Sequence, residues 1–162
     1  MYSQILYSAF EVQECLSRGE AVMIDVRDPD AFQQAHIPGA VNVPEVFSYL
    51  ATSTPEGLAE MHATFEGLFA RAGIASSKKV FFYEGNLHEL YGGSCRGYWL
   101  LRYFGHSAAA ILDGGLAAWQ AKGFPLEKGA ADCTPAAFAV QPLPEMIATK
   151  ADVLDALQSS DV

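Results

Sequence analysis

Short apolar runs alternate with helical patterns along most of the chain. The runs are long enough for buried strands and too short for helices, and they fall at residues 21–26, 41–43, 80–83 and 108–112. Between the second and third runs, Thr54 and Pro55 open a long helical pattern that ends near Gly73. Strands that alternate with helices, without a hairpin signal, predict a parallel α/β sheet.

The stretch 78–106 combines a strand with a glycine-bearing loop and an apolar helix expected from about residue 94 to 104. Backbone N–H groups and the helix dipole at such a junction favour an anion. We therefore predict an anion pocket here. Its candidate residues are Glu84, Gly92, Gly93, Ser94 and Arg96. Glu84 follows the strand directly, and the nearest thiol, Cys95, comes eleven residues later.

Composition narrows the class of protein. A net charge of −9 argues against nucleic acid and anionic membrane surfaces as partners. No stretch approaches the roughly 20 apolar residues that span a bilayer, and the N-terminus has no basic region typical of a signal peptide. Cys15, Cys95 and Cys133 are scattered, which indicates reduced thiols in a cytoplasmic protein.

The histidines show no spacing typical of metal ligands, so we expect neither a metal site nor a cofactor. His36 lies in a turn, His36-Ile-Pro-Gly-Ala40, and we interpret it as a packing or turn residue.

Proline accumulates between Gly123 and Pro144, and apolar periodicity is lost there. We predict a domain at 1–127, an extended linker at 128–147 and the start of a truncated second repeat at 148–162. The repeat rests on a match at a shift of 141 residues, where the segment from Ala151 resembles the segment from Phe10. On pattern alone, a plain amphipathic C-terminal helix explains these residues equally well.

Four motifs together resemble the rhodanese family of sulfurtransferases, in order and spacing, from about residue 8 to 126. They are Asp25-Val-Arg27, His36-Ile-Pro-Gly-Ala40, Phe104-Gly-His106 and Leu112-Asp-Gly-Gly-Leu-Ala-Ala-Trp119. The last of them, followed by Gly123-Phe-Pro125, is similar to two-domain members, in which a long linker joins two rhodanese domains. This resemblance favours the truncated-repeat interpretation.

The resemblance implies a central parallel sheet of about five strands with helices on both faces. It also implies a reaction. A cysteine at a strand exit takes sulfane sulfur from thiosulfate, or a related donor such as mercaptopyruvate, as a persulfide, and passes the sulfur to cyanide or a thiol. A thiolate beside a helix N-terminus suits this covalent transfer, because the dipole lowers the thiol pKa.

The chain departs from the active pattern at one position. Glu84 stands where an active rhodanese carries its cysteine, and Arg96 matches the arginine that follows the loop. Inactive N-terminal domains of two-domain members carry an acidic residue there. The resemblance therefore implies a non-catalytic domain that forms a wall of the active-site cleft and stabilises a second rhodanese domain in cis. Asp25 and Arg27 are assigned to structure, at the end of the first predicted strand.

Two alternatives remain open. Cys95 lies near a helix start beside Arg96, where dipole and charge favour thiolate, so the chain could be an active single-domain sulfurtransferase that forms a Cys95 persulfide. The second alternative is a rhodanese-like binding module, which presents the loop from Glu84 to Cys95 to a protein partner.

Overall fold

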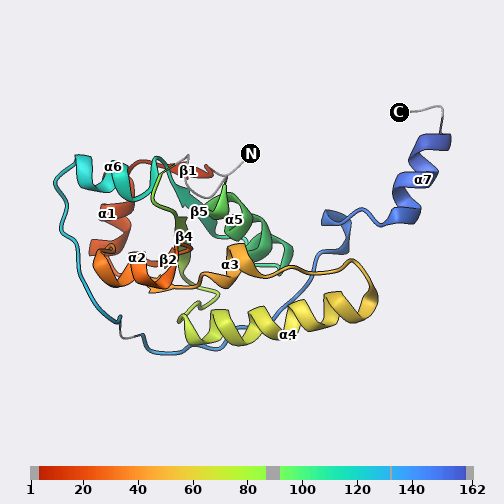
Figure 1. The fold of residues 1–162 in the computed structure, drawn as a ribbon, viewed down its shortest axis with the longest axis horizontal. Coiled ribbons are helices and arrows are strands. Elements are labelled where there is room, and N and C mark those ends of the chain that lie inside the picture. The colour runs from red at the N-terminus through yellow and green to blue at the C-terminus, as the bar shows by residue number, and fades with distance from the viewer. Residues whose placement is uncertain (1–3, 87–91, 132, 160–162) are drawn as a thin grey trace.

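A parallel five-stranded sheet forms the centre of the computed structural model, which describes residues 4–86, 92–131 and 133–159 (Figure 1). The strand order is β1-β5-β4-β2-β3, and every neighbouring pair is parallel. The strands are β1 Leu6–Tyr7, β2 Ala21–Asp25, β3 Val41–Asn42, β4 Lys79–Tyr83 and β5 Ala109–Leu112. The predicted fold class is confirmed.

Helices cover both faces of the sheet. They are α1 Ala9–Ser17, α2 Pro29–Gln34, α3 Glu45–Ser48, α4 Pro55–Arg71, α5 Gly93–Tyr103, α6 Gly115–Ala121 and α7 Lys150–Gln158, with a 3-10 turn, η1, at Pro144–Met146. Side chains alternate along β4, so Val80 and Phe82 join one hydrophobic core, whereas Phe81 and Tyr83 join the other. The first core packs against α4 and α5, and the second packs against α1, α2 and α6.

The pattern of apolar residues does not predict two of the elements, β1 and α3. The edge strand β1 has only two residues and Leu6 is 54% exposed. The apolar run that contains it, Ile5-Leu6-Tyr7, is too short to predict a strand by itself. The helix α3 has only four residues, of which Val46 alone is buried. Pattern by itself predicts four strands, and only the family resemblance predicts the fifth.

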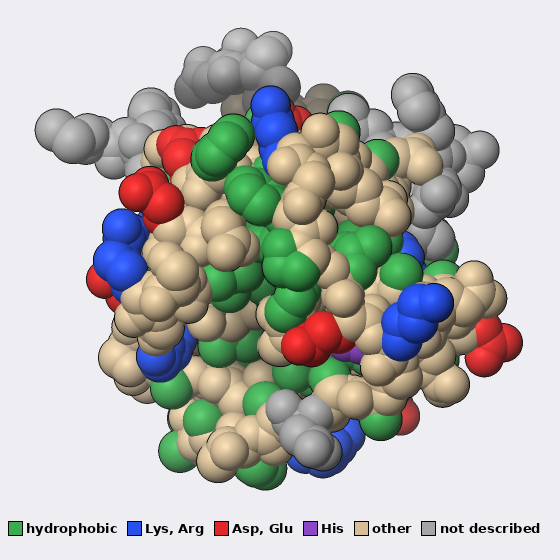
Figure 2. Space-filling model, turned by 90° about the vertical axis from the view of Figure 1, so that its left-hand side faces the viewer, with side chains coloured by type: hydrophobic (Ala, Val, Ile, Leu, Met, Phe, Trp, Pro, Cys, Tyr) green, Lys and Arg blue, Asp and Glu red, His purple; other side chains and the backbone are tan. Residues whose placement is uncertain are grey.

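Figure 2 shows the end of the molecule that carries α1, α2 and α6, where hydrophobic side chains lie among charged ones. A shallow depression of about 230 Å³ lies between α1 and α6, and its lining includes Leu16, Pro38 and Trp119. Within the described part of the chain, no helix is both long enough and apolar enough to span a bilayer.

The segment after α6 lies along the domain. The backbone N–H of Ala136 donates to the Ala70 carbonyl at 2.9 Å, and that of Leu143 donates to the Tyr103 carbonyl at 2.8 Å. Phe138 and several other apolar side chains of this segment pack against the core beneath α4 and α5. These contacts hold the segment on the domain up to η1.

The helix α7 stands apart from the sheet, at the end of the molecule opposite α1, and all of its residues are exposed (Figure 1). Its N-terminus repeats that of α1. Ser8 and Glu11 form a capping box on α1, and Thr149 and Asp152 form one on α7, at the same shift of 141 residues. Cap hydrogen bonds lower the pKa of both acidic residues.

Candidate functional site

Glu84 directly follows β4, and its side chain is hydrogen-bonded to the start of α5. Its side chain is buried, and the residue is 2% exposed. The carboxylate accepts a hydrogen bond from the backbone N–H of Gly93 at 3.1 Å and another from the Ser94 hydroxyl at 2.8 Å. Both donors belong to the first turn of α5, where unpaired N–H groups and the helix dipole favour a negative charge. The predicted anion pocket therefore contains a carboxylate of the chain itself.

Two glycines allow this geometry. Gly92 is the N-cap of α5 and has φ 90°, a left-handed conformation that side chains rarely adopt. Gly97 lies on the face of α5 that meets β4, because a Cβ at this position would lie 2.4 Å from Cδ1 of Phe82. The absence of a side chain at Gly97 lets the helix approach the strand closely enough for Glu84 to reach Gly93.

Arg96 is directed to a different part of the domain. Its guanidinium donates to the carbonyl oxygen of Phe47 at 3.0 Å and to that of Tyr49. These carbonyls lie in and just after α3, so Arg96 ties α3 to α5. The structure thus brings Glu84, Gly93 and Ser94 together and turns the Arg96 guanidinium towards α3.

Cys95 is exposed, in contrast to the buried Glu84 beside the same helix start. Tyr91, which also belongs to the predicted loop, lies outside the described residues. Of the other thiols, Cys15 is half-buried, and partial burial raises the pKa of Cys133. No cluster of three or more His, Cys, Asp or Glu side chains suited to a metal occurs in the described ranges 4–86, 92–131 and 133–159.

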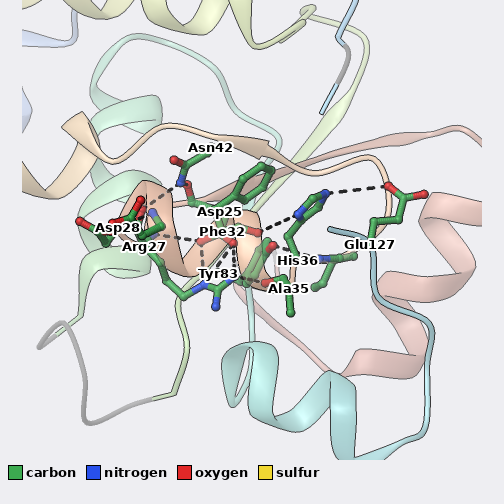
Figure 3. A network of polar contacts seen from close by, with 11 residues as sticks. Asp25, Arg27, Asp28, Phe32, Ala35, His36, Asn42, Tyr83 and Glu127 are labelled. Carbon is green, nitrogen blue, oxygen red and sulfur yellow. Dashed lines mark hydrogen bonds and ion pairs between the residues drawn. The ribbon is translucent and has the colours of Figure 1, made fainter. Parts of the chain in front are cut away.

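Asp25 and Arg27 pair at the end of β2, as Figure 3 shows. Nη2 of Arg27 lies 2.6 Å from Oδ2 of Asp25 and also donates to the Ala35 carbonyl at 2.7 Å. Asp25 is fully buried and Arg27 is 8% exposed. Burial alone would lower the pKa of Arg27, but the hydrogen bonds and charge of Asp25 outweigh burial and raise it. The pair holds β2 to the turn that follows α2.

His36 lies in the same network (Figure 3). Its ring stacks on Phe32 with centroids 3.9 Å apart, and Nδ1–H donates to the Phe32 carbonyl at 2.9 Å. Nε2 lies 3.9 Å from a carboxylate oxygen of Glu127. The backbones of His36 and Glu127 also exchange two hydrogen bonds of 2.9 Å. His36 therefore fixes the chain after α6 to the turn before β3.

Sequence reasoning missed two members of this network. The Tyr83 hydroxyl accepts a hydrogen bond from the Ile37 N–H at 3.2 Å, and burial, followed by the charge of Asp25, raises the pKa of Tyr83. Tyr83 ends an apolar run, so its position alone predicts an ordinary core residue. Glu127 lies at the predicted domain boundary, where no pattern marks it. The hydroxyl of Tyr83, at the end of an otherwise apolar run, was the available signal.

The five-stranded parallel sheet, with helices on both faces, is the fold of a rhodanese-like domain. The family model described as a rhodanese-like domain matches residues 8–122, so the chain belongs to the rhodanese family. It is 32% identical over 128 residues to 3-mercaptopyruvate sulfurtransferase of Homo sapiens, covering 79% of this chain and 43% of the relative. It is 30% identical over 129 residues to thiosulfate sulfurtransferase of Cricetulus griseus, with the same coverage.

Among solved structures, a 3-mercaptopyruvate sulfotransferase from Escherichia coli matches with a TM-score of 0.79 and 26% identity. The match covers 97% of this chain and 63% of that one. The chain thus spans less than half the length of the curated relatives named above. The relatives and the solved structure named here are sulfurtransferases, and the chain shares the rhodanese family and fold with them.

Proposed function

We propose that this chain is the N-terminal, non-catalytic domain of a two-domain rhodanese-type sulfurtransferase, with Glu84 at the position of the nucleophile. The observation that carries the proposal is the buried Glu84 carboxylate at the end of β4, held by Gly93 and Ser94. In the family pattern this junction holds a cysteine and an anionic sulfur donor.

A glutamate carboxylate at this position cannot perform the reaction of a cysteine thiolate. A persulfide forms when a thiolate attacks the outer sulfur of thiosulfate, whose S–S bond breaks and releases sulfite, and a carboxylate cannot hold sulfur in this manner. The carboxylate also satisfies donors of α5 that would otherwise bind an anion. An anionic donor would meet both an occupied pocket and a like charge. The domain is therefore a scaffold, and sulfur transfer from thiosulfate or mercaptopyruvate to a thiol or cyanide takes place on another domain.

Two further observations support a second domain in cis. The chain covers 43% of its curated relatives, so they contain more sequence than one such domain requires. In addition, α7 repeats the capping box of α1 and buries none of its residues. The proposal assigns residues 148–162 to the start of the second domain and 128–147 to the linker. Three free thiols support a reducing compartment, and we place the protein in the cytoplasm.

Cys95 offers the second candidate function. Its thiol is exposed at the first turn of α5. In this alternative the isolated chain takes up sulfur on Cys95. A binding module that presents residues 84–95 is the third candidate, and its central part, 87–91, lies outside the described residues.

Thiocyanate formation from thiosulfate and cyanide separates these functions. The two-domain protein should form thiocyanate at a rate that Cys95→Ser leaves unchanged, and the 162-residue chain alone should form none. Cys133→Ser is the matched control for loss of an exposed thiol. Thiocyanate formation by the chain alone, abolished by Cys95→Ser and retained in Cys133→Ser, would transfer the activity to Cys95.

A further inference from the structure

An apolar groove of about 330 Å³ lies where the connection between α3 and α4 meets α5. Its lining includes Leu50, Met61, Trp99, Leu100, Met146 and Ile147. Leu50 is 84% exposed and Trp99 is 37% exposed, although both side chains are large and apolar. Solvent-exposed apolar surface of this kind is typical of an interaction site.

The chain leaves the domain at this groove. Met146 ends η1 and Ile147 follows it, and both residues contribute to the lining. The Leu143 N–H bond to the Tyr103 carbonyl holds the segment in place, and α7 begins at Lys150. Figure 1 shows that α7 lies beyond η1, at the end of the molecule that the connection between α3 and α4 also reaches.

The register of the repeat shows which apolar residues of α7 need an outside partner. Val12 is fully buried in α1, and its counterpart at a shift of 141 residues is Val153, which is 50% exposed. The sheet of a second domain would cover Val153 as the first sheet covers Val12. Leu154 is different, because its counterpart is the polar Gln13. Leu154 is 47% exposed, and burial inside a second repeat does not explain it.

We propose that the groove lined by Leu50 and Trp99, together with Leu154, is the surface on which the second rhodanese domain packs. This inference rests on the proposed function and names the contact that joins the two domains. The occupant is the chain that continues from α7, because Met146 and Ile147 already lead the backbone through the groove. Burial of Leu50 and Trp99 removes apolar area from water and thereby couples the domains.

Trp99 provides a direct reporter. The chain has two tryptophans, and Trp119 is 1% exposed, so collisional quenching by acrylamide in the 162-residue chain acts mainly on Trp99. Subtracting the signal of the Trp99→Phe variant isolates Trp99 in the two-domain protein. We expect the quenching constant of Trp99 to fall several-fold in the two-domain protein, with a blue shift of its emission.

Two matched variants make the test specific. Leu50→Glu should leave the fold of the 162-residue chain intact, because Leu50 is largely exposed, and should restore the quenching of Trp99 in the two-domain protein. Phe10→Glu is the control, because Phe10 is 60% exposed on α1 at the opposite end of the molecule. It should leave Trp99 protected. Circular dichroism verifies the fold of each variant.

Three outcomes overturn the inference. Equal quenching of Trp99 in both proteins means that the groove stays open, even where thiocyanate assays uphold the proposed function. Quenching of the 162-residue chain that falls with protein concentration assigns the groove to a second copy. Protection of Trp99 that Leu50→Glu does not reduce places the contact elsewhere. Failure of the proposed function has a separate signature, which is thiocyanate formation by the 162-residue chain alone.

Discussion

Replacing Glu84 with glutamine removes the charge from the pocket while preserving the size of the side chain. The amide keeps one oxygen acceptor, but its NH₂ group replaces the second oxygen. One donor of the α5 turn, either the Gly93 N–H or the Ser94 hydroxyl, then faces a donor instead of an acceptor. Because the site is buried, water cannot compensate for the lost hydrogen bond.

The magnitude follows from these contacts. A hydrogen bond to a charged group contributes about 1.5–3 kcal/mol. A negative charge at an exposed helix N-terminus adds about 0.3–1 kcal/mol. Glu84→Gln should therefore lower the free energy of unfolding by about 2–4 kcal/mol. At this chain length about 2–4 °C corresponds to each kcal/mol, so the Tm should fall by about 4–16 °C.

Urea denaturation followed by circular dichroism measures this change. Glu60→Gln is the matched control, because Glu60 lies exposed on α4 and its replacement should change stability by less than about 0.5 kcal/mol. Ser94→Ala removes one of the donors, and its cost should shrink in the Glu84→Gln background because the two residues share a hydrogen bond. Equal stability of Glu84→Gln and the parent chain would refute the view that the carboxylate fills the pocket.

Three other changes test the surrounding structure. Asp25→Asn leaves Arg27 buried without its counter-charge and should cost about 3–5 kcal/mol in urea denaturation. Gly97→Ala places a Cβ 2.4 Å from the Phe82 ring and should cost about 1–3 kcal/mol of thermal stability. Burial lowers the pKa of His106, so stability is complete above the ordinary histidine pKa and declines as pH falls through the lowered value. His106→Gln should flatten that decline in urea titrations between about pH 7 and pH 5.

Asp25→Asn and Gly97→Ala each have a matched control variant. Arg18 and Glu20 form an exposed ion pair, and Glu20→Gln should leave stability unchanged within error. Gly67 lies inside α4, where a Cβ would approach only the terminal Nη1 of Arg71, so Gly67→Ala should be neutral or stabilising. If these control variants lost as much stability as Asp25→Asn and Gly97→Ala, burial would not explain the effect of the test variants. For His106→Gln, an unchanged slope with pH would contradict the assigned sign.

The sequence predicts the fold well where the apolar runs are long enough. The strand that ends at Tyr83 and the long helix after Thr54 appear within one or two residues of their expected bounds. The edge strand at Leu6 and Tyr7 is not predicted, because a strand of two residues is too short to show periodicity. Short elements depend on their neighbours for stability, and no local pattern records those neighbours.

Some contacts of the candidate site could be predicted from the sequence, and others could not. Glu84 and Ser94 meet because strand and helix are joined by one loop, and the order of residues already implies that contact. Arg96 turns to the carbonyls of Phe47 and Tyr49, which lie 49 and 47 residues away in sequence. Contacts of this range depend on how α3 packs against α5. They could not be predicted from a single sequence.

The central claim is that the Glu84 position cannot carry sulfur and that Cys95 does not replace it. The intact mass of the 162-residue chain, recorded after incubation with thiosulfate and removal of excess donor, tests this claim directly. We predict an unchanged mass. A gain of one sulfur atom that disappears in Cys95→Ser, and persists in Cys133→Ser, would contradict the claim and make Cys95 the sulfur carrier.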